Sequence, residues 1–474
     1  MRIRKRLFCP KPLNPLSMAI RNYSKPLAIF ITTTLALVSL FMLSSSSVLP
    51  PPPAPESPLS PTEAWEFTAP NRTDNTVTTD WENPIVANGA VYLCNNEAYT
   101  IPEESYAPFL PVQPQHKLGT IYALDYSNGA HLWNFTANSR VSRLDVVNQI
   151  AYVCASANIY ALNATTGAQK WVYSIDGYII WSELHDQVIY VFFDDSGYDS
   201  YVCAINATSG AGLWRWNAGY YVWPSQLAFS DGAVYFGIDN TYYAVNITDG
   251  NTLWSTPING GISESYTLID SILYFKSSSN ASYSIGNKLN AYLNALDIQT
   301  GEKLWSYPVG VNTSPLPIVE NGVVYVNGRE ATVKNPRSFT LQLAWGASNV
   351  FAINASNGNK VWNYSANDMD FSALSVIGDV VYFSSSNGTL HALNATNGAQ
   401  LWSNPLSDSQ SFTIHNGAFY YHCDNTLFAL DASNGNTLWT YTTASNMSFL
   451  TVLGSTMFFA ANNTVYAIPT YPSS

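Results

Sequence analysis

The chain has 474 residues, of which 47% are hydrophobic and only 11% are charged, and its formal net charge is −12. Soluble domains usually carry about 25% charged residues, so this chain is poor in charge yet has enough apolar residues for a large core. These numbers exclude an intrinsically disordered chain and a polycationic binder of nucleic acid. The length predicts about three ordinary domains, or one large domain if the chain consists of repeats.

The charge is distributed unevenly along the chain. Residues 1–26 contain seven basic residues and no acidic one, whereas the remainder carries 13 basic and 32 acidic residues, a net charge of −19. A surface of this sign repels phosphate backbones, so we expect no nucleic-acid partner.

An uncharged, mostly apolar segment, residues 27–48, follows the basic segment directly. About 20 apolar residues are enough for a helix to span a bilayer, and flanking basic residues are typical of the cytoplasmic side. The segment therefore predicts a transmembrane anchor, with residues 1–26 in the cytoplasm and the bulk of the chain outside the cell. The alternative is a cleaved signal sequence, since Ser44–Ser47 are small residues, and cleavage would release a secreted protein.

Residues 49–62 are rich in proline, a composition that favours an extended, semi-rigid linker. The linker would hold the following domain, residues 63–474, away from the membrane.

A repeat dominates this domain. Gly is followed four residues later by Trp eight times, Asp or Asn stands four residues before each Gly, and Ala stands two residues before that. Each unit is typical of a strand, a tight turn that Asp or Asn opens and Gly closes, and a second strand. With two further strands upstream, the period of about 44 residues predicts a four-stranded propeller blade. The repeated tryptophans are Trp133, Trp171, Trp214, Trp254, Trp305, Trp362, Trp402 and Trp439.

The pattern Tyr-Ala-Leu-Asp-x-x-x-Gly-x-x-x-Trp, which begins at Tyr122, resembles the tryptophan-docking repeat of the pyrroloquinoline-quinone-like β-propellers. The resemblance implies an all-β fold, a single propeller of four-stranded blades. It also implies that each repeated Trp packs against the neighbouring blade.

The end of the chain predicts how the ring closes. The last unit, residues 464–469, begins the repeat but lacks its Gly-x-x-x-Trp strand, and residues 64–69 resemble the outer strand at residues 132–137. Pairing of the two ends would remove exposed sheet edges. Eight complete repeats and this closing unit leave eight or nine blades open, since the family is usually eight-bladed.

Long insertions suggest which face of the propeller binds a ligand. Residues 95–119, 276–292 and 327–348 interrupt the connection between second and third strands, which shares a face with the connections between blades. Long loops on a rigid scaffold often carry binding sites, so we expect a protein or carbohydrate partner on this face. The opposite face carries the motif turns and five glycosylation sequons: Asn163, Asn206, Asn246, Asn354 and Asn394.

Aromatic and acidic residues near the connections between blades are the ligand-binding candidates. Trp181 and Trp223 have a competing interpretation, in which they only fill the start of an inner strand. The candidates are Trp181, Glu183, Tyr220, Tyr221, Trp223, Tyr266, Asp368 and Asp370.

Catalytic interpretations are the alternative to a binding role. The family includes quinone-dependent dehydrogenases, which the resemblance implies would hold Ca²⁺ and often use adjacent cysteines; this sequence has neither adjacent cysteines nor C-x-x-C-H, so the quinone is not expected. A carbohydrate-acting hydrolase could pair Glu183 with Asp368 or Asp370. The acidic segment with Asp194, Asp195 and Asp199 could bind Ca²⁺, but it lacks the full EF-hand ligand spacing, and a solvated turn is the favoured interpretation.

These observations predict a membrane-anchored extracellular propeller that acts as a non-catalytic scaffold for a protein or a glycan. Non-catalytic relatives, such as the outer-membrane assembly scaffold lipoprotein, use the repeat for protein contacts. The alternative is a quinone-dependent dehydrogenase or a carbohydrate-acting enzyme that uses the central funnel.

Overall fold

The computed structural model describes residues 65–70, 78–100, 115–222, 224–278, 287–289, 291–311, 316–335, 342–366, 370–405 and 412–470. The predicted cytoplasmic segment, membrane anchor and proline-rich linker lie outside these ranges. Within them, no helix is long and apolar enough to cross a membrane.

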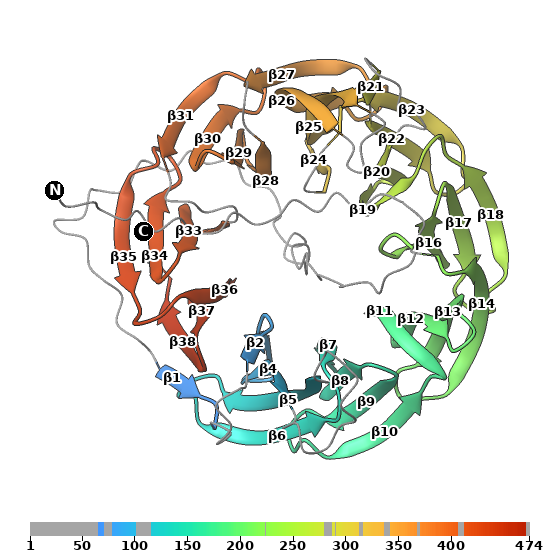
Figure 1. The fold of residues 1–474 in the computed structure, drawn as a ribbon, viewed down its shortest axis with the longest axis vertical. Helices are drawn as coiled ribbons and strands as arrows, with labels where there is room; N and C mark the ends of the chain where they lie inside the picture. Colours follow the sequence, from blue (N-terminus) through green and yellow to red (C-terminus); the bar gives the residue numbers. More distant parts are fainter. Residues whose placement is uncertain are drawn as a thin grey trace. The chain divides into compact units, whose positions relative to one another are not determined.

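Nine antiparallel sheets stand around a central axis as the blades of a propeller (Figure 1). All belong to one compact unit, Pro51–Ser474. The predicted all-β propeller is confirmed. The number of blades, which the sequence left open between eight and nine, is nine. The first strand of each blade lies nearest the axis, and the strand with the repeated Trp lies at the rim.

The strands follow one another blade by blade. Blades 1 to 3 comprise β2 (Thr78–Trp81), β3 (Ile85–Ala87), β4 (Ala90–Thr100), β5 (Gln115–Asp125) and β6 (His131–Ala137); β7 (Val141–Val147), β8 (Ile150–Ala155), β9 (Asn158–Asn163) and β10 (Gln169–Ser174); β11 (Gly177–His185), β12 (Val188–Asp195), β13 (Asp199–Asn206) and β14 (Gly212–Tyr220). Blades 4 to 6 comprise β15 (Ala228–Ser230), β16 (Ala233–Ile238), β17 (Thr241–Asn246) and β18 (Thr252–Pro257); β19 (Ile262–Ile269), β20 (Ile272–Ser278), β22 (Ala291–Asp297) and β23 (Lys303–Pro308); β21 (Lys288–Leu289), β24 (Ile318–Glu320), β25 (Val323–Asn335), β26 (Gln342–Asn354) and β27 (Lys360–Ala366). Blades 7 to 9 comprise β28 (Phe371–Ile377), β29 (Val380–Ser385), β30 (Thr389–Asn394) and β31 (Gln400–Pro405); β32 (Thr413–His415), β33 (Ala418–Cys423), β34 (Thr426–Asp431) and β35 (Thr437–Thr442); β36 (Met447–Leu453), β37 (Thr456–Ala461), β38 (Thr464–Pro469) and β1 (Trp65–Thr68).

The core lies between the blades. Second strands such as β16 are buried along their whole length because a neighbouring sheet covers each of their faces. Rim strands such as β18 instead alternate between exposed and partly buried residues, as expected of a strand with one covered face. The continuous apolar runs in the sequence are therefore the second strands.

Seven of the eight repeated tryptophans, all except Trp439, dock on the glycine turn of the next blade. The indole of Trp133 donates a hydrogen bond to the carbonyl oxygen of Ala164 at 2.8 Å. A Cβ atom added to Gly167 would lie 2.7 Å from the same indole. The contact recurs: the glycines at which such a Cβ would lie within 3.0 Å of the preceding blade's Trp are Gly129, Gly167, Gly210, Gly250, Gly301, Gly358, Gly398 and Gly435.

The turn itself has the geometry that the Asp/Asn and Gly columns predict. In blade 1 the carboxylate of Asp125 accepts the backbone N–H of Ser127 at 2.8 Å, and Gly129 donates its N–H to the Asp125 carbonyl at 2.9 Å. Gly129 has φ of 70°, a conformation that glycine adopts without a steric penalty. Glycine is therefore required twice, by the backbone and by the indole that packs on it.

A second aromatic column supports the Trp column. The hydroxyl of Tyr92, on the second strand of blade 1, donates to the Ala164 carbonyl at 3.1 Å, so this one oxygen binds both Tyr92 and Trp133. The two rings are 5.9 Å apart between centroids. The sequence analysis missed this role, although the column can be read from the alignment of the repeats: Tyr92, Tyr152, Tyr190, Tyr235, Tyr274, Tyr325, Tyr382 and Tyr420.

The N-terminal strand closes the ring, as predicted. β1 pairs with β38 in the register Trp65↔Ala467, which makes it the rim strand of blade 9. Trp65 then docks on blade 1 like the repeated tryptophans, with its indole N–H 3.0 Å from the Tyr126 carbonyl. Because Trp65 supplies the docking residue that the last unit lacks, the latch completes both the sheet and the circle of inter-blade contacts.

The long insertions differ from the loops that we expected. Their described parts continue the strands: β4 and β5 have 11 residues each, and β25 and β26 have 13 each. The prediction of loops is wrong there because the inserted sequence still alternates, with Ala331 and Val333 only 1% exposed. β21, from the insertion of blade 5, pairs with β25 of blade 6.

The docking contact predicts that two glycine substitutions in blade 4 differ in cost. Gly232 and Gly250 have φ of 75° and 74°, but only Gly250 lies under an indole, that of Trp214; a Cβ atom on Gly232 would meet nothing within 4 Å. Gly232→Ala should cost about 1–2 kcal/mol of unfolding free energy for its left-handed backbone. Gly250→Ala should cost clearly more, measured by denaturant unfolding; equal losses would contradict the docking role.

Candidate functional site

The two faces of the propeller differ in what they carry. Successive strands of a blade run in opposite directions, so the turn from the second to the third strand shares an edge with the connection to the next blade. We call this edge the hairpin face. The opposite edge, which carries the Asp/Asn and Gly turns, is the turn face.

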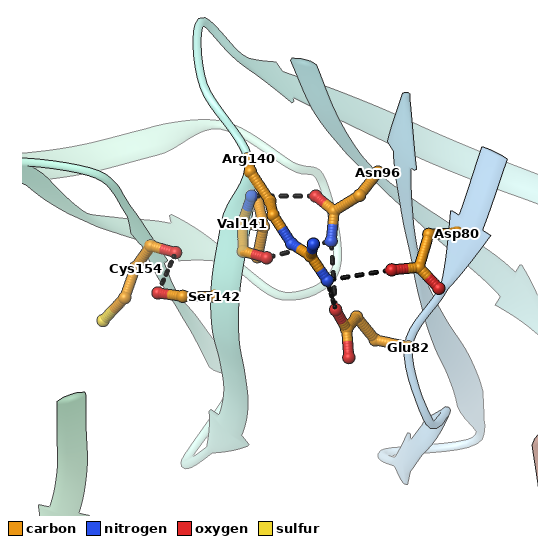
Figure 2. A network of polar contacts seen from close by, with 7 residues as sticks. All are labelled: Asp80, Glu82, Asn96, Arg140, Val141, Ser142 and Cys154. Atoms are coloured by element: carbon orange, nitrogen blue, oxygen red, sulfur yellow. Dashed lines mark hydrogen bonds and ion pairs between the residues drawn. The ribbon is translucent and has the colours of Figure 1, made fainter. Parts of the chain in front are cut away.

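A polar network on the hairpin face joins blade 1 to blade 2 (Figure 2). Arg140, just before β7, donates to the carboxylates of Asp80 at 2.8 Å and Glu82 at 3.0 Å. The buried Asn96 amide bonds both the N–H and the C=O of Val141, at 2.9 and 3.0 Å, and donates to Glu82 at 3.2 Å. The Asn96 side chain therefore takes the place of a neighbouring strand and satisfies both backbone groups of Val141. None of these residues lies in a motif that the sequence marks as a site.

A second charged cluster lies on the innermost strands of blades 2 and 3. Arg143 and Asp145 of β7 form an ion pair through two contacts, at 2.6 and 3.3 Å. The Arg143 guanidinium carbon lies 5.9 Å from the ring centroid of Trp181 on β11. Glu183, two residues further along β11, interacts electrostatically with both Arg143 and Asp145.

Burial decides the protonation of Glu183. It raises the pKa of this carboxyl group to about 7; the Asp145 carboxylate raises it as well, while Arg143 lowers it. Glu183 also raises the pKa of Tyr266, a group that burial already raises and whose hydroxyl donates to the Leu227 carbonyl. Three predicted ligand residues, Trp181, Glu183 and Tyr266, therefore belong to one cluster.

Tyr220 and Tyr221 lie in a different place, at the hairpin face of blade 3. Tyr220 is 70% exposed and Tyr221 is 49% exposed. Both rings pack edge to face on Tyr198, which lies in the turn between β12 and β13 and which the sequence analysis did not name. Trp223 lies outside the described residues.

Asp370 belongs to a third place, the approach to blade 7. Its carboxylate accepts a hydrogen bond from Arg329 at 2.7 Å, and the Arg329 guanidinium also lies 5.1 Å from the Trp345 ring. Asp370 thus pairs with an arginine of blade 6, whereas Glu183 interacts with Arg143 of blade 2. Asp368 lies outside the described residues.

The acidic segment proposed for Ca²⁺ uses its carboxylates internally. Asp194 accepts the hydroxyl of Ser200 at 2.5 Å, and Asp195 accepts the backbone N–H groups of Gly197 and Asp199 at 2.9 and 3.0 Å. Across the described part of the chain, no group of three or more His, Cys, Asp or Glu side chains could hold a metal ion.

The five sequon asparagines lie in the turns of the turn face. In each, the side-chain oxygen accepts a backbone N–H two residues further along, at 2.7 to 3.0 Å. The same residue thus builds the turn and forms the sequon, and glycosylation remains a prediction.

The family model described as outer membrane protein assembly factor BamB matches residues 110–191 and 198–441. The chain belongs to this family. The match covers blades 2 to 8 almost completely, together with the second half of blade 1.

Other similarities are partial or remote. A tetrathionate hydrolase from Acidithiobacillus ferrooxidans is 26% identical over 204 residues, which span 39% of this chain and 37% of that protein. The chain therefore aligns with little more than a third of the length of this relative.

Two solved structures that are similar to the chain have TM-scores below 0.5. The structure of BamB from Moraxella catarrhalis has a TM-score of 0.42 at 16% identity, covering 75% of this chain and 93% of that one. A europium-containing methanol dehydrogenase has a TM-score of 0.44 at 12% identity, covering 84% of each chain.

The raised pKa of Glu183 predicts a specific pH dependence of stability. The carboxyl group ionises near its ordinary value of 4.5 when unfolded and near 7 when folded, so its contribution is complete below pH 4.5 and is lost as the pH rises to 7. The loss is at most about 3 kcal/mol. Glu183→Gln should therefore lose less stability than the wild type between pH 5 and pH 8, measured by denaturant midpoints. The exposed Glu66→Gln is the control that should follow the wild type, and identical pH profiles for Glu183→Gln and wild type would contradict the assignment.

Proposed function

We propose that the chain is a membrane-anchored extracellular scaffold that binds a protein or glycan partner on its hairpin face. The observation that carries the proposal is the selective lengthening of hairpins on that face. β25 and β26 have 13 residues each, whereas β8 and β9 of blade 2 have six each. A ring needs only the short strands to close, so the additional length serves a purpose other than closure.

The composition of the turn face also favours a partner on the hairpin face. Its five sequons would place glycans next to the docked tryptophans, where a partner would otherwise approach. Export of the domain, anchoring by residues 27–48 and glycosylation are parts of this proposal. The charge difference between residues 1–26 and the remainder supports that orientation.

A hydrolase that uses the central funnel is the second candidate. Glu183 has a pKa of about 7, which suits a group that donates a proton near neutral pH. The relative named tetrathionate hydrolase, which aligns over 204 residues, also favours hydrolytic chemistry. The binding role is preferred because Asp145, the described carboxylate that interacts with Glu183, already forms an ion pair with Arg143 at 2.6 Å.

Site-specific photo-crosslinking in cells that produce the full chain tests the binding role. A benzophenone amino acid at Glu330, whose side chain is 58% exposed on β25, should yield adducts with a partner. The same group at the exposed Asn128 of the turn face should yield few or none. Glu183→Gln should leave the adducts unchanged, because Glu183 lies on β11 of blade 3 and not on the lengthened strands of blade 6. Equal adducts from the two faces would contradict the proposal. Loss of the Glu330 adducts in Glu183→Gln would favour the hydrolase.

A further inference from the structure

Blade 3 carries an unusual group of exposed side chains on the hairpin face. Tyr198, Tyr220 and Tyr221 are 58%, 70% and 49% exposed, although large aromatic side chains are generally buried. We call these three tyrosines, together with Asp194, Asp195 and Asp199, the Tyr–Asp rim. Of the three tyrosines, the sequence predicts a ligand contact only for Tyr220 and Tyr221.

The three rings pack against one another. Tyr198 lies 6.5 Å from Tyr220 and 6.3 Å from Tyr221 between centroids, at interplanar angles of 63° and 67°, so both contacts are edge to face. The rings nevertheless stay largely exposed, Tyr220 most of all. An exposed tyrosine ring attracts a cation that lies over its face within about 6 Å.

The backbone holds Tyr198 and Tyr221 in place. Tyr198 and Tyr221 have φ of 66° and 49°, a left-handed conformation that bulky residues rarely adopt. A hydrogen bond from the N–H of Tyr221 to the carbonyl of Tyr198, at 2.9 Å, joins the two strained residues, and the N–H of Tyr198 donates to the Asp195 carbonyl at 3.0 Å. Such strain is typical of sites that hold side chains ready for a function.

Charge on the rim favours a cation. Three aspartates lie at the end of the hairpin, and the nearest described countercharge is Arg215, 3.6 Å from Asp195. The exported part of the chain carries a net charge of −19, so the long-range field has the same sign. An anionic ligand would be repelled both locally and at a distance.

The same hairpin already holds one cation on aromatic rings. The guanidinium carbon of Arg215 lies 3.3 Å from the ring centroid of Tyr201 and 4.8 Å from that of Phe193. Blade 3 thus combines aromatic faces and a carboxylate around an arginine of its own.

We propose that the Tyr–Asp rim binds a lysine or arginine side chain of a protein partner. The inference rests on the proposed binding function and deepens it, because it selects a protein over a glycan and names the chemistry of the contact. The exposed tyrosine rings supply cation–π attraction, and the aspartates supply the opposite charge.

Binding of a labelled peptide to the purified full chain tests the inference. The probe is a fluorescein-labelled hexalysine amide, measured by fluorescence anisotropy, with its fully acetylated form as the neutral control. Hexalysine should bind and the acetylated form should not. Tyr220→Ala should weaken binding roughly 2- to 30-fold. Tyr220→Phe should retain hexalysine binding, because phenylalanine keeps the aromatic ring.

Two further variants separate the rim from general attraction to an acidic protein. Asp199→Asn should weaken binding, since it removes one carboxylate of the rim. Leu253→Ala, at a residue that is 54% exposed on the outermost strand of blade 4, β18, should leave binding unchanged. Tyr220 is so exposed that its variants should unfold at the wild-type temperature.

Wild-type affinity for hexalysine in Tyr220→Ala, or equal binding of the acetylated peptide, would overturn the inference. Tyr220-dependent binding of a neutral oligosaccharide such as chitohexaose, without binding of hexalysine, would also overturn it, while leaving the proposed binding function intact. Failure of the proposed function is a separate result, namely equal cross-linking from Glu330 and Asn128.

Discussion

The structure depends on one contact, the packing of a tryptophan indole on a glycine turn of the next blade. Trp133 and Gly167 are representative: the indole occupies the space that a Cβ atom would need, and its N–H bonds the Ala164 carbonyl. The contact fixes the distance between successive blades at the rim. Tyr92 reinforces it by bonding the same carbonyl from the second strand. Repetition of this unit determines the ring, and Trp65 carries the contact across the gap between the two ends of the domain.

Because the docking contacts occupy the turn face and the rim, variation is tolerated at the hairpin face. The lengthened strands of blades 1 and 6 and the tyrosines of blade 3 all lie there. Charged clusters such as Arg140 with Glu82 join blades at their inner ends without altering the docking. A constant framework thus supports a variable surface, which is the arrangement expected of a binding scaffold.

The sequence predicts the framework well because its signals are local. Trp133, Gly129 and Asp125 lie within nine residues of one another, so the turn that they build recurs as a visible pattern. The ion pair of Arg140 with Asp80 joins residues 60 positions apart and exists only because two blades stack. No local pattern marks this ion pair, nor the packing of Tyr198 on Tyr220. The length of the hairpin extensions predicts loops, whereas their alternation of buried and exposed residues is the signal that predicts strands.

Hydrogen–deuterium exchange of Trp65→Ala tests most directly whether docking closes the ring. Removing this indole should open blade 9 at its edge, since β1 would lose its contact with the Tyr126 carbonyl of blade 1. The account predicts faster exchange in β38 (Thr464–Pro469) and β1, with exchange in β16 and β17 of blade 4 unchanged. Unchanged exchange in β38, or an equal acceleration in every blade, would contradict it.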